Sequence, residues 1–511
     1  MNVLLVYPQF PITFWSYTYA LRFIGRRALG PPLGLLTVAA MLPREWPVRL
    51  VDLNVHQLRA EDLAWADYVW LSAMAIQQNS AREVVTRAHR AGVPVVAGGP
   101  LFSAQPDIIP AVDCLVLNEA ELTLPPFLAD LCAGRLQPRY ATTAYADMTL
   151  SPTPRFELAA IHRYAMMPIQ YSRGCPFDCE FCDVTAQLGR RPRHKTVSQV
   201  LAELDALKAL GWHRGVFLVD DNLIGSRQHL KTELLPALIA WQRRRGPLVF
   251  NAQVSIDLAD DPDLVTLLAR AGINTVFIGI ETPDVQTLRA CHKRQNTHRD
   301  LLADVKHLQA AGITVQAGFI VGFDHDTPSI FQRQIDFIQA SGITTAMVGL
   351  LQALKGTRLH RRMQRENRLR QESAGDNVGA MPNFIPAMSE HDLRAGYRKL
   401  LAAIYSPPYY YQRAQTFLRN YRRPPIPERL QWQDIRAFLR AHIVLGVLGR
   451  ERFRYWRFLV WTLCHQPWLL PKSVELAVLG HHFRLVCARY SRALRRAAAP
   501  RVERPRLGGV G

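Results

Sequence analysis

The sequence predicts an α/β protein with two parallel sheets and a helical C-terminal region. Residues 1–133 and 164–365 each alternate short apolar runs with amphipathic stretches of helical length. Parallel neighbours in a sheet need a crossover of a dozen or more residues, usually a helix, so this alternation is typical of parallel sheets. Residues 366–511 show mostly helical periodicity instead. The predicted order along the chain is therefore sheet, sheet, helices.

Residues 1–133 are predicted to form a doubly wound sheet. The expected strands are Asn2–Tyr7, Val48–Asp52, Tyr68–Ser72, Pro94–Ala97 and Cys114–Leu117, with helices near 33–42, 80–91 and 119–131. Such sheets bind ligands at the carboxyl ends of their strands. At those ends the chain has Gly98 and Gly99 after the fourth strand, and Asn118 and Glu119 after the fifth.

After a polar, proline-bearing linker at 134–163, residues 164–365 are predicted to form six strand–helix units. The expected strands are Pro168–Ser172, Val216–Val219, Phe250–Val254, Thr275–Ile280, Val315–Val321 and Thr345–Leu350. Intervening segments such as Val197–Leu210 and Arg299–Ala311 have the apolar periodicity of helices. Six such units make a partial (β/α)6 barrel, whose chemistry is expected at the carboxyl ends of its strands.

Cys175, Cys179 and Cys182 have the spacing C-x3-C-x2-C. Three thiolates can bind three irons of a [4Fe–4S] cube and leave the fourth iron open for chemistry. Zinc prefers four ligands, usually as two close pairs, and the other five cysteines are isolated in the sequence. The spacing therefore favours an open cluster over a structural zinc site or three unconnected thiols.

This motif resembles that of the radical S-adenosylmethionine (SAM) enzymes. In that family the open iron holds SAM, and an electron from the cluster splits SAM to give a 5'-deoxyadenosyl radical. The resemblance implies that the three cysteines bind the cluster and are catalytic, and that Phe181 is the aromatic residue beside the third one. The further SAM contacts that it implies, at the ends of successive strands, are Asp220, Asp221, Asn222, Glu281, Gly318 and Gly322.

The N-terminal sheet followed by this barrel resembles the cobalamin-binding branch of the same family. The cobalamin contacts that this resemblance implies are Gly98, Gly99, Asn118 and Glu119. Cobalamin domains that ligate cobalt through histidine carry D-x-H-x-x-G, whereas here His56 lies four residues after Asp52. We therefore expect no protein histidine on the cobalt. Two cofactors that face one cavity also predict a large pocket between the sheet and the barrel.

Residues 1–420 further resemble the subgroup that includes the hopanoid C-2 methylase. This implies methyl transfer to an unactivated carbon, possible only with radical chemistry because no side-chain base removes a proton from an sp3 carbon at neutral pH. The implied cofactors are a [4Fe–4S] cluster, SAM and cobalamin, and the implied substrate is a hopanoid or other lipid. Two alternatives stay open. One is a cobalamin-dependent cyclase or rearrangement enzyme, and the other is a membrane- or nucleic-acid-binding protein with a structural or sensory cluster.

The net charge of +20 is concentrated in residues 401–511, which hold 20 Arg and Lys against 5 Asp and Glu. Such a bias indicates an anionic partner or a solvated arginine-rich surface. The helical region 366–496 is also rich in Trp and Tyr, as in Arg450–Trp461, and suits docking on an anionic membrane or a lid over the barrel. Nucleic acid is not expected as the partner. The tail, 497–511, is expected to be disordered.

The sequence predicts a cytoplasmic enzyme, at most peripheral on the inner face of the membrane. Its eight cysteines lack paired spacing, which indicates a reducing compartment. The start, Met1–Pro8, has the pattern of a buried strand rather than of a secretory signal, and no window has the apolar length that spans a bilayer. We expect a small-molecule or lipid substrate and an electron donor such as flavodoxin or ferredoxin.

Overall fold

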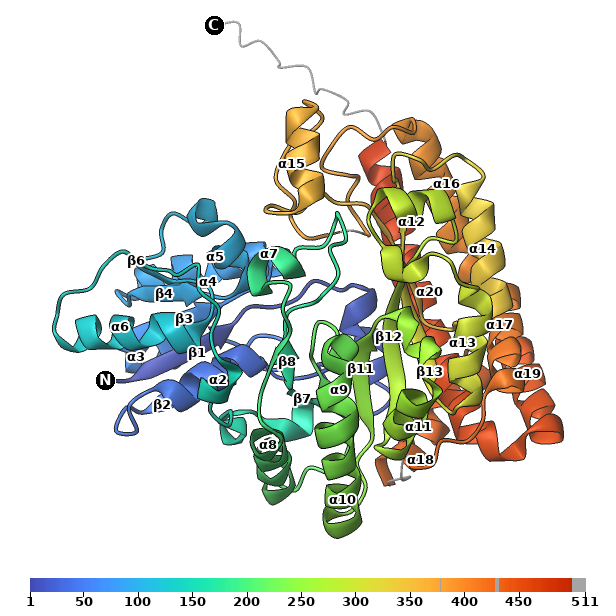
Figure 1. The fold of residues 1–511 in the computed structure, drawn as a ribbon, viewed down its shortest axis with the longest axis horizontal. Helices are drawn as coiled ribbons and strands as arrows, with labels where there is room; N and C mark the ends of the chain where they lie inside the picture. The colour runs from blue at the N-terminus through green and yellow to red at the C-terminus, as the bar shows by residue number, and fades with distance from the viewer. Residues whose placement is uncertain (377, 428–431, 499–511) are drawn as a thin grey trace, which may run out of the picture.

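Two six-stranded parallel sheets lie side by side, and a group of helices follows them in the chain (Figure 1). The computed structural model describes residues 1–376, 378–427 and 432–498. The strand order is β2-β1-β3-β4-β5-β6 in the first sheet and β14-β13-β12-β11-β10-β7 in the second. The second order follows the chain, as in a partial barrel, so the predicted fold class is confirmed.

The first sheet is built around β1, which is buried on both faces. Its strands are β1 (Val3–Tyr7), β2 (Val48–Asp52), β3 (Tyr68–Ser72), β4 (Val95–Gly98), β5 (Cys114–Val116) and β6 (Arg139–Tyr140), and its helices are α2 (Leu33–Met41), α3 (Ala60–Trp65), α4 (Gln78–Arg90), α5 (Pro100–Ala104) and α6 (Ala120–Cys132). Leu4 and Val6 belong to a core shared with α4, whereas Val3 and Leu5 belong to a core shared with α2 and α6. Burial on both faces explains why the strand is a continuous apolar run.

The main departure from the predicted first sheet is β6, which lies inside the predicted linker 134–163. It pairs in parallel with β5, through Leu115 and Val116 opposite Arg139 and Tyr140. A strand of two residues, one of them charged, produces no apolar run. It was therefore not predictable from periodicity.

Five strands of the second sheet match the predicted strands to within two residues at each end, and the first, predicted as Pro168–Ser172, ends three residues earlier. Its strands are β7 (Met167–Ile169), β10 (Val216–Leu218), β11 (Phe250–Val254), β12 (Ile273–Glu281), β13 (Thr314–Val321) and β14 (Ala346–Leu350), and its longer helices are α8 (Val197–Ala209), α10 (Leu235–Arg245), α11 (Pro262–Arg270), α13 (Leu301–Ala310) and α14 (Ile330–Ser341). The predicted strand Pro168–Ser172 divides in two. Its end joins β8 (Ser172–Arg173), which pairs antiparallel with β9 (Arg193–His194).

The C-terminal region is helical and packs against the second sheet. Its helices are α15 (Arg358–Arg365), α16 (Glu390–Ile404), α17 (Pro407–Asn420), α18 (Trp432–Ala441), the π-helical turn η11 (His442–Val447), α19 (Arg452–His465) and α20 (Leu470–Ala498). Helices α16 and α17 cover α14, and Tyr490 of α20 donates a hydrogen bond to the Ile12 carbonyl. Of the predicted tail, residues 497 and 498 end α20 and the remainder lies outside the described residues.

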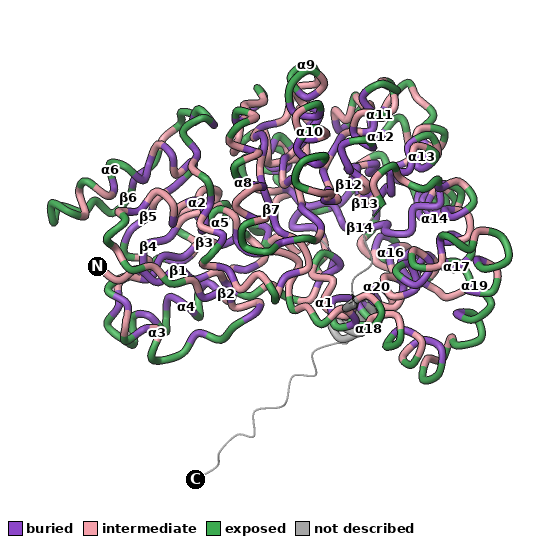
Figure 2. Tube along the Cα trace, turned by 90° about the horizontal axis from the view of Figure 1, so that it is seen from below, coloured by how far each residue is buried: buried purple, intermediate pink, exposed green. Residues whose placement is uncertain are grey.

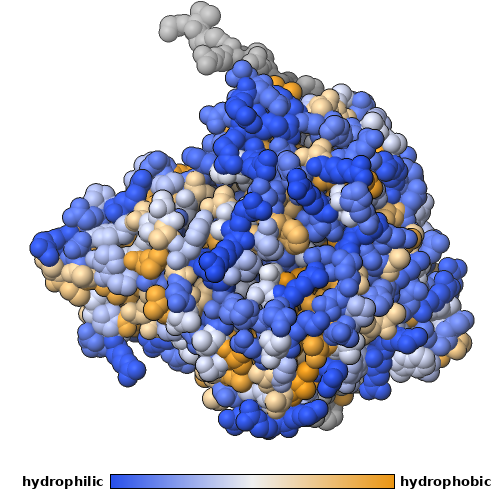
Figure 3. Space-filling model, in the orientation of Figure 1, coloured by the Kyte–Doolittle hydropathy of each residue, from blue (hydrophilic) through white to orange (hydrophobic). Residues whose placement is uncertain are grey.

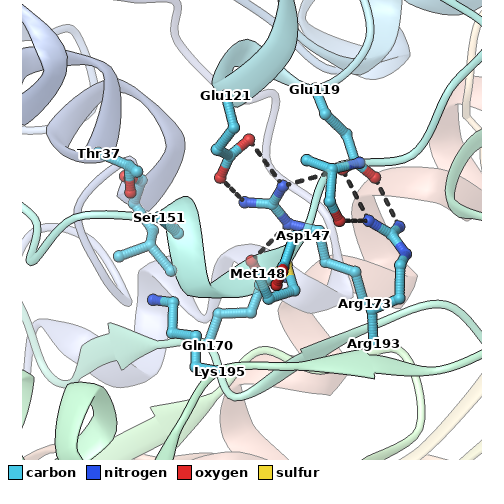
Figure 4. Close-up of polar contacts among 12 residues, drawn as sticks. Thr37, Glu119, Glu121, Asp147, Met148, Ser151, Gln170, Arg173, Arg193 and Lys195 are labelled. Carbon is cyan, nitrogen blue, oxygen red and sulfur yellow. Dashed lines mark hydrogen bonds and ion pairs between the residues drawn. The ribbon is translucent and has the colours of Figure 1, made fainter.

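Two glutamate–arginine pairs join the first sheet to the hairpin of β8 and β9 (Figure 4). Glu121 of α6 pairs with Arg173 of β8, with nitrogen–oxygen distances of 3.0 and 2.8 Å. Glu119, just before α6, pairs with Arg193 of β9 at 2.8 and 2.6 Å. Arg173 also lies 3.6 Å from Glu119, so the four side chains form one network. We call Glu119, Glu121, Arg173 and Arg193 the inter-sheet clamp.

The clamp is an ionic network that is largely withdrawn from water. Its side chains are between 2% and 18% exposed. Burial alone would raise the pKa of Glu121, but the hydrogen bonds and the charge of Arg173 outweigh it and lower that pKa. A carboxyl group of this kind stabilises the fold above its unfolded pKa, and the contribution is lost as the pH falls through the folded pKa. The Glu121–Arg173 pair is therefore at full strength at neutral pH and weakens in acid.

Replacing Arg173 with Met should destabilise the protein by about 3–5 kcal/mol, because Glu121 would keep a buried charge without its counterion. The double variant Arg173→Met/Glu121→Leu should recover most of that loss, since both charges of the pair are then gone. Urea unfolding of the three proteins measures the two differences. Equal stability of the single and the double variant would show that Glu121 carries no buried charge that Arg173 offsets.

Candidate active site

The three motif cysteines lie on the loop between β8 and α7 (Val184–Leu188). Gly174 opens this loop with a φ of +96°, and a Cβ there would approach three carbonyl oxygens of residues 188–191 to 3.0–3.1 Å. The Cys175 N–H donates to the Gly189 carbonyl at 3.2 Å, and the Gly174 N–H donates to the Asp221 carboxylate at 3.0 Å. Only glycine fits at position 174, where the loop packs closely against residues 188–191, and this packing fixes the position of the first cysteine.

The donor set of the loop fits a three-cysteine iron–sulfur cluster. Burial raises the pKa of the Cys175 thiol and raises that of Cys182 to about 12, but a thiol that coordinates a metal is deprotonated outright. In the part of the chain that the structure describes, no three His, Cys, Asp or Glu side chains converge so as to hold a single metal ion. A cube does not need such convergence, because each thiolate binds a different iron.

Glu281 and Lys293 form a buried ion pair beside the cysteines, with 2.8 Å between Nζ and Oε1. Burial alone would lower the pKa of Lys293, but the charges of Glu281 and Cys179 outweigh it and raise that pKa, so the amine stays protonated. A Cβ at Gly279 would collide with the Glu281 carboxylate. Sequence reasoning identified Glu281 and missed Lys293, since a single lysine 12 residues further on belongs to no pattern that we recognised.

The acidic residues after β10 support the cysteine loop through hydrogen bonds. Asp220 accepts from the N–H of Tyr171 and from both the N–H and the hydroxyl of Ser172, and burial raises its pKa to about 6. Asp221 accepts from the loop itself, and Asn222 bonds to the residue that follows β11. These bonds explain why polar residues end this strand. Their contact with SAM stays a prediction.

The glycines of β13 and the aromatic residue of the motif pack on the same side of the second sheet. Gly322 has a φ of +101°, and its N–H donates to the Asp326 carboxylate at 2.8 Å. A Cβ at Gly318 would lie 3.0 Å from an aromatic ring of β12. The ring of Phe181 meets that of Phe323 edge to face, with 5.9 Å between centroids. The turn after β13 thus packs against the cysteine loop, while the SAM contacts of Gly318, Gly322 and Phe181 stay predictions.

A cavity of about 240 Å³ lies at the carboxyl ends of the first sheet's strands. All four residues predicted there line it: Gly98, Gly99, Asn118 and Glu119. A Cβ at Gly98 would collide with a carbonyl oxygen of β5, and one at Gly99 would collide with the Ser72 hydroxyl. Glycine at these two positions therefore permits close packing within the sheet edge. The cavity that all four predicted residues line supports a cofactor site at the predicted edge.

The same cavity reaches the cysteine hairpin, because Arg173, Gln187 and Leu188 also line it. It is smaller than the large pocket predicted from the sequence, since α7 contacts α5 across it. Both Glu119 oxygens already bind the clamp, which limits what this carboxylate can offer a ligand. Among the described residues that line the cavity there is no histidine.

A second cavity, of about 720 Å³, lies on the outer side of the cysteine loop. The first turn of α15 is tied to that loop, because the Leu359 N–H donates to the Glu180 carbonyl at 2.9 Å. The residues of α15 that line the cavity are Arg358, Arg361, Arg362, Gln364 and Arg365. Arg362 pairs with Glu180 at 2.6 Å, whereas Arg361 and Arg365 have no carboxylate partner within the described ranges. Figure 3 shows α15 as a strongly hydrophilic projection.

Three family descriptions match successive parts of the chain. Residues 24–128 match the B12 binding domain, residues 169–338 match the radical SAM superfamily, and residues 357–496 match a domain of unknown function, DUF4070. The first match covers the cavity of the first sheet and the second covers the cysteine loop. The helices that include α15 and α19 therefore belong to a conserved unit without an assigned role.

Two relatives match nearly the whole chain. An uncharacterized methyltransferase of Synechocystis sp. is 38% identical over 490 residues, which are 94% of this chain and 91% of that protein. The hopanoid C-2 methylase of Rhodopseudomonas palustris is 34% identical over 525 residues, 98% of each chain. The radical SAM methyltransferase TsrM of Kitasatospora setae, solved with cobalamin and a [4Fe–4S] cluster bound, shares the fold, with a TM-score of 0.59 and 17% identity over 82% of this chain and 99% of that one.

These matches fit the two sites seen in the structure. The three-cysteine loop lies in the part that matches the radical SAM superfamily, whose cofactors are a [4Fe–4S] cluster and SAM, and the sheet-edge cavity lies mainly in the part that matches the B12 binding domain. Its full-length relatives are a methylase and a methyltransferase, which does not favour the cyclase alternative. The chain therefore belongs to the cobalamin-dependent radical SAM methyltransferases, the family that includes the hopanoid C-2 methylase and methylates unactivated carbon.

Proposed function

We propose that the substrate is a polycyclic lipid of the hopanoid type, methylated at an unactivated ring carbon. The observation that carries this proposal is the match to the hopanoid C-2 methylase over 98% of both chains, which extends through the C-terminal helices. A substrate of this kind is apolar and resides in membranes. The exposed apolar side chains on the same helices are consistent with it.

We assign distinct tasks to the two sites. When bound, the cluster supplies the electron that cleaves SAM, and cobalamin supplies the methyl group. Cys175, Cys179 and Cys182 would hold the cluster, while Glu281 and Lys293 keep a buried, charged pair beside it. Gly98, Gly99 and Asn118 would receive the corrinoid, with no protein histidine on its cobalt. The clamp sets the position of one site relative to the other.

The electron must come from outside the chain, and we propose an acidic one-electron carrier such as flavodoxin or ferredoxin. The surface around α15 supports this proposal, because it is rich in arginine and is hydrogen-bonded to Glu180, the residue after Cys179. Arg361 and Arg365 are exposed and lack carboxylate partners among the described residues. Opposite charge speeds the encounter of such partners. We further propose peripheral contact with an anionic membrane, and no role for nucleic acid.

Reconstituted protein supplied with SAM, cobalamin, a reductant and an unmethylated hopanoid should yield a product one methylene group heavier, detected by mass spectrometry. Cys175→Ala should lose both the iron–sulfur absorbance and the product, because the cube then has only two protein ligands. Cys132→Ala serves as the matched control, since Cys132 is exposed on α6 and far from the motif in sequence. A full set of hopanoids left unmethylated by the active, SAM-cleaving protein would contradict the lipid assignment.

Charge reversal on α15 should separate the natural carrier from a chemical reductant. At low salt, flavodoxin should reduce the Arg361→Glu/Arg365→Glu variant at least about tenfold more slowly than the unaltered protein, since steering by opposite charge is lost. With dithionite the rate should be unchanged. Arg243→Glu/Arg244→Glu makes the same change of charge at the exposed end of α10 and should affect neither rate. A variant slowed equally with both reductants would place the defect in the cluster and not in docking.

A further inference from the structure

The described residues contain twenty large hydrophobic side chains that are exposed, and ten of them lie between residues 435 and 468. They are Ile435, Leu439, Ile443, Val447, Leu448, Phe453, Trp456, Val460, Leu463 and Trp468. Single exposed hydrophobic residues are ordinary, but a large group in one segment marks an interaction site. This segment comprises α18, η11, α19 and the turns beside them.

The exposed residues follow the helical repeat, so they line one side of each helix. On α18 and η11 they recur every four residues, at 435, 439, 443 and 447. On α19 they recur at 453, 456, 460 and 463, whereas the face turned inward holds Tyr455, Phe458 and Leu459. Spacings of three and four keep each set on one helix face. Each helix thus has one apolar face in the core and a second one in water.

The two exposed faces meet where the helices pack together. The Trp456 Nε1–H donates to the Gly446 carbonyl at 3.0 Å. A Cβ at Gly446 would lie 3.0–3.1 Å from that indole ring, so glycine permits the close approach. Val447, one of the exposed side chains, is the next residue after Gly446 in the chain. We call residues 435–468, in which η11 packs against α19, the helical hairpin.

The tip of this hairpin carries both its most exposed apolar side chains and a set of unpaired arginines. Leu448 is 73% exposed and Phe453 is 77% exposed, one on each side of the turn. The exposed arginines interleaved with them or next in sequence are Arg450, Arg452, Arg454 and Arg457. None of these four has a carboxylate partner within the part of the chain that the structure describes. The intervening Glu451 is engaged elsewhere, with Arg484 at 2.6 Å.

We propose that this hairpin, residues 435–468, is the surface by which the enzyme docks on an anionic phospholipid bilayer. Aromatic and aliphatic side chains beside arginines are the pattern of elements that lie in the membrane interface. Anionic headgroups would neutralise the unpaired arginines while the apolar side chains enter the acyl boundary. No described helix is long and apolar enough to cross a membrane, which agrees with a peripheral contact.

A second copy of the chain fits this surface less well. A symmetric dimer brings the same patch of each copy together, so the arginines of the tip would face one another without compensation. A bilayer presents the opposite charge at every point. Helix α19 of the hairpin also lies at the edge of the molecule remote from the first sheet (Figures 1 and 2). The enzyme could therefore dock there without covering the cobalamin-site cavity.

This inference rests on the proposed lipid substrate for its purpose, but its test is independent of methylation. The full-length, cofactor-loaded protein is mixed with phosphatidylcholine vesicles that contain or lack phosphatidylglycerol, and binding is measured by flotation. Binding should require the anionic lipid. Leu448→Ser/Phe453→Ser should weaken it on the order of tenfold or more, because two exposed hydrophobic anchors are lost. Arg452→Glu/Arg454→Glu should weaken it by more than about fivefold for each arginine.

Matched controls place the same changes elsewhere. Leu136→Ser/Leu150→Ser removes two exposed leucines of the first half of the chain, and Arg243→Glu/Arg244→Glu reverses two exposed charges on α10. Both should bind vesicles as the unaltered protein does. Equal binding by the hairpin variants and their controls would overturn the proposal. So would hairpin variants that lose only a dimer in size-exclusion chromatography and still float with the vesicles.

Activity toward a hopanoid in detergent separates this proposal from the proposed function. The hairpin variants should methylate the detergent-dispersed substrate at the unaltered rate and lose at least about tenfold in rate when it is embedded in anionic vesicles. One outcome is that the unaltered protein and the variants all fail to methylate a hopanoid in detergent while vesicle binding follows the predicted pattern. That result would contradict the substrate assignment and leave the docking surface supported. If flotation fails and detergent activity persists, the docking surface alone is wrong.

Discussion

The geometry of the candidate active site depends on the burial of two carboxylates between the sheets. Glu119 and Glu121 extend from the first sheet, and Arg173 and Arg193 extend from the hairpin that carries the cysteines (Figure 4). A buried carboxylate without its partner costs several kcal/mol. The first sheet and the hairpin therefore cannot separate without leaving a buried charge unpaired or exposing it to water. Arg173 stands two residues before Cys175. The same ion pairs that close the interface therefore also position Cys175, the first cysteine of the motif.

This arrangement brings the cavity at the carboxyl ends of the first sheet and the cysteine loop after β8 to a common boundary. At both places the chain passes through a glycine whose Cβ would crowd neighbouring atoms. These are Gly98 and Gly99 at the first sheet, and Gly174 just after β8 of the small antiparallel hairpin. Helix α7 closes the boundary between them. The cluster and the corrinoid must act on one substrate, and a shared rigid boundary keeps their separation fixed while the substrate is held.

Most of the fold was predictable because its strands carry buried apolar residues, either in continuous runs or at alternate positions. β1 contributes alternate residues to two cores and β14 is buried throughout, whereas β11 alternates buried with half-buried residues. Both β11 and β14 were predicted to within one residue. β6 was not predictable, since two residues that include an arginine carry no apolar signal. The cysteines were evident from spacing alone. The ion pairs that hold the cysteine loop in place were not predictable from the sequence, because no local pattern connects their partners. Arg173 and Glu121 are 52 residues apart, and Arg193 and Glu119 are 74 residues apart.

The polar residues at the strand ends show why position alone does not define a role. Asp220 was predicted as a SAM contact from its place after β10, and that prediction stands, yet its carboxylate already receives three donors from Tyr171 and Ser172. Glu119 likewise lines the cavity of the first sheet while both its oxygens bind arginine. A residue with its acceptors used in this way can shape a pocket by holding the backbone around it. Polar side chains at these sheet edges thus hold the backbone around the predicted sites, and Asp220 and Glu119 keep few acceptor positions for a cofactor.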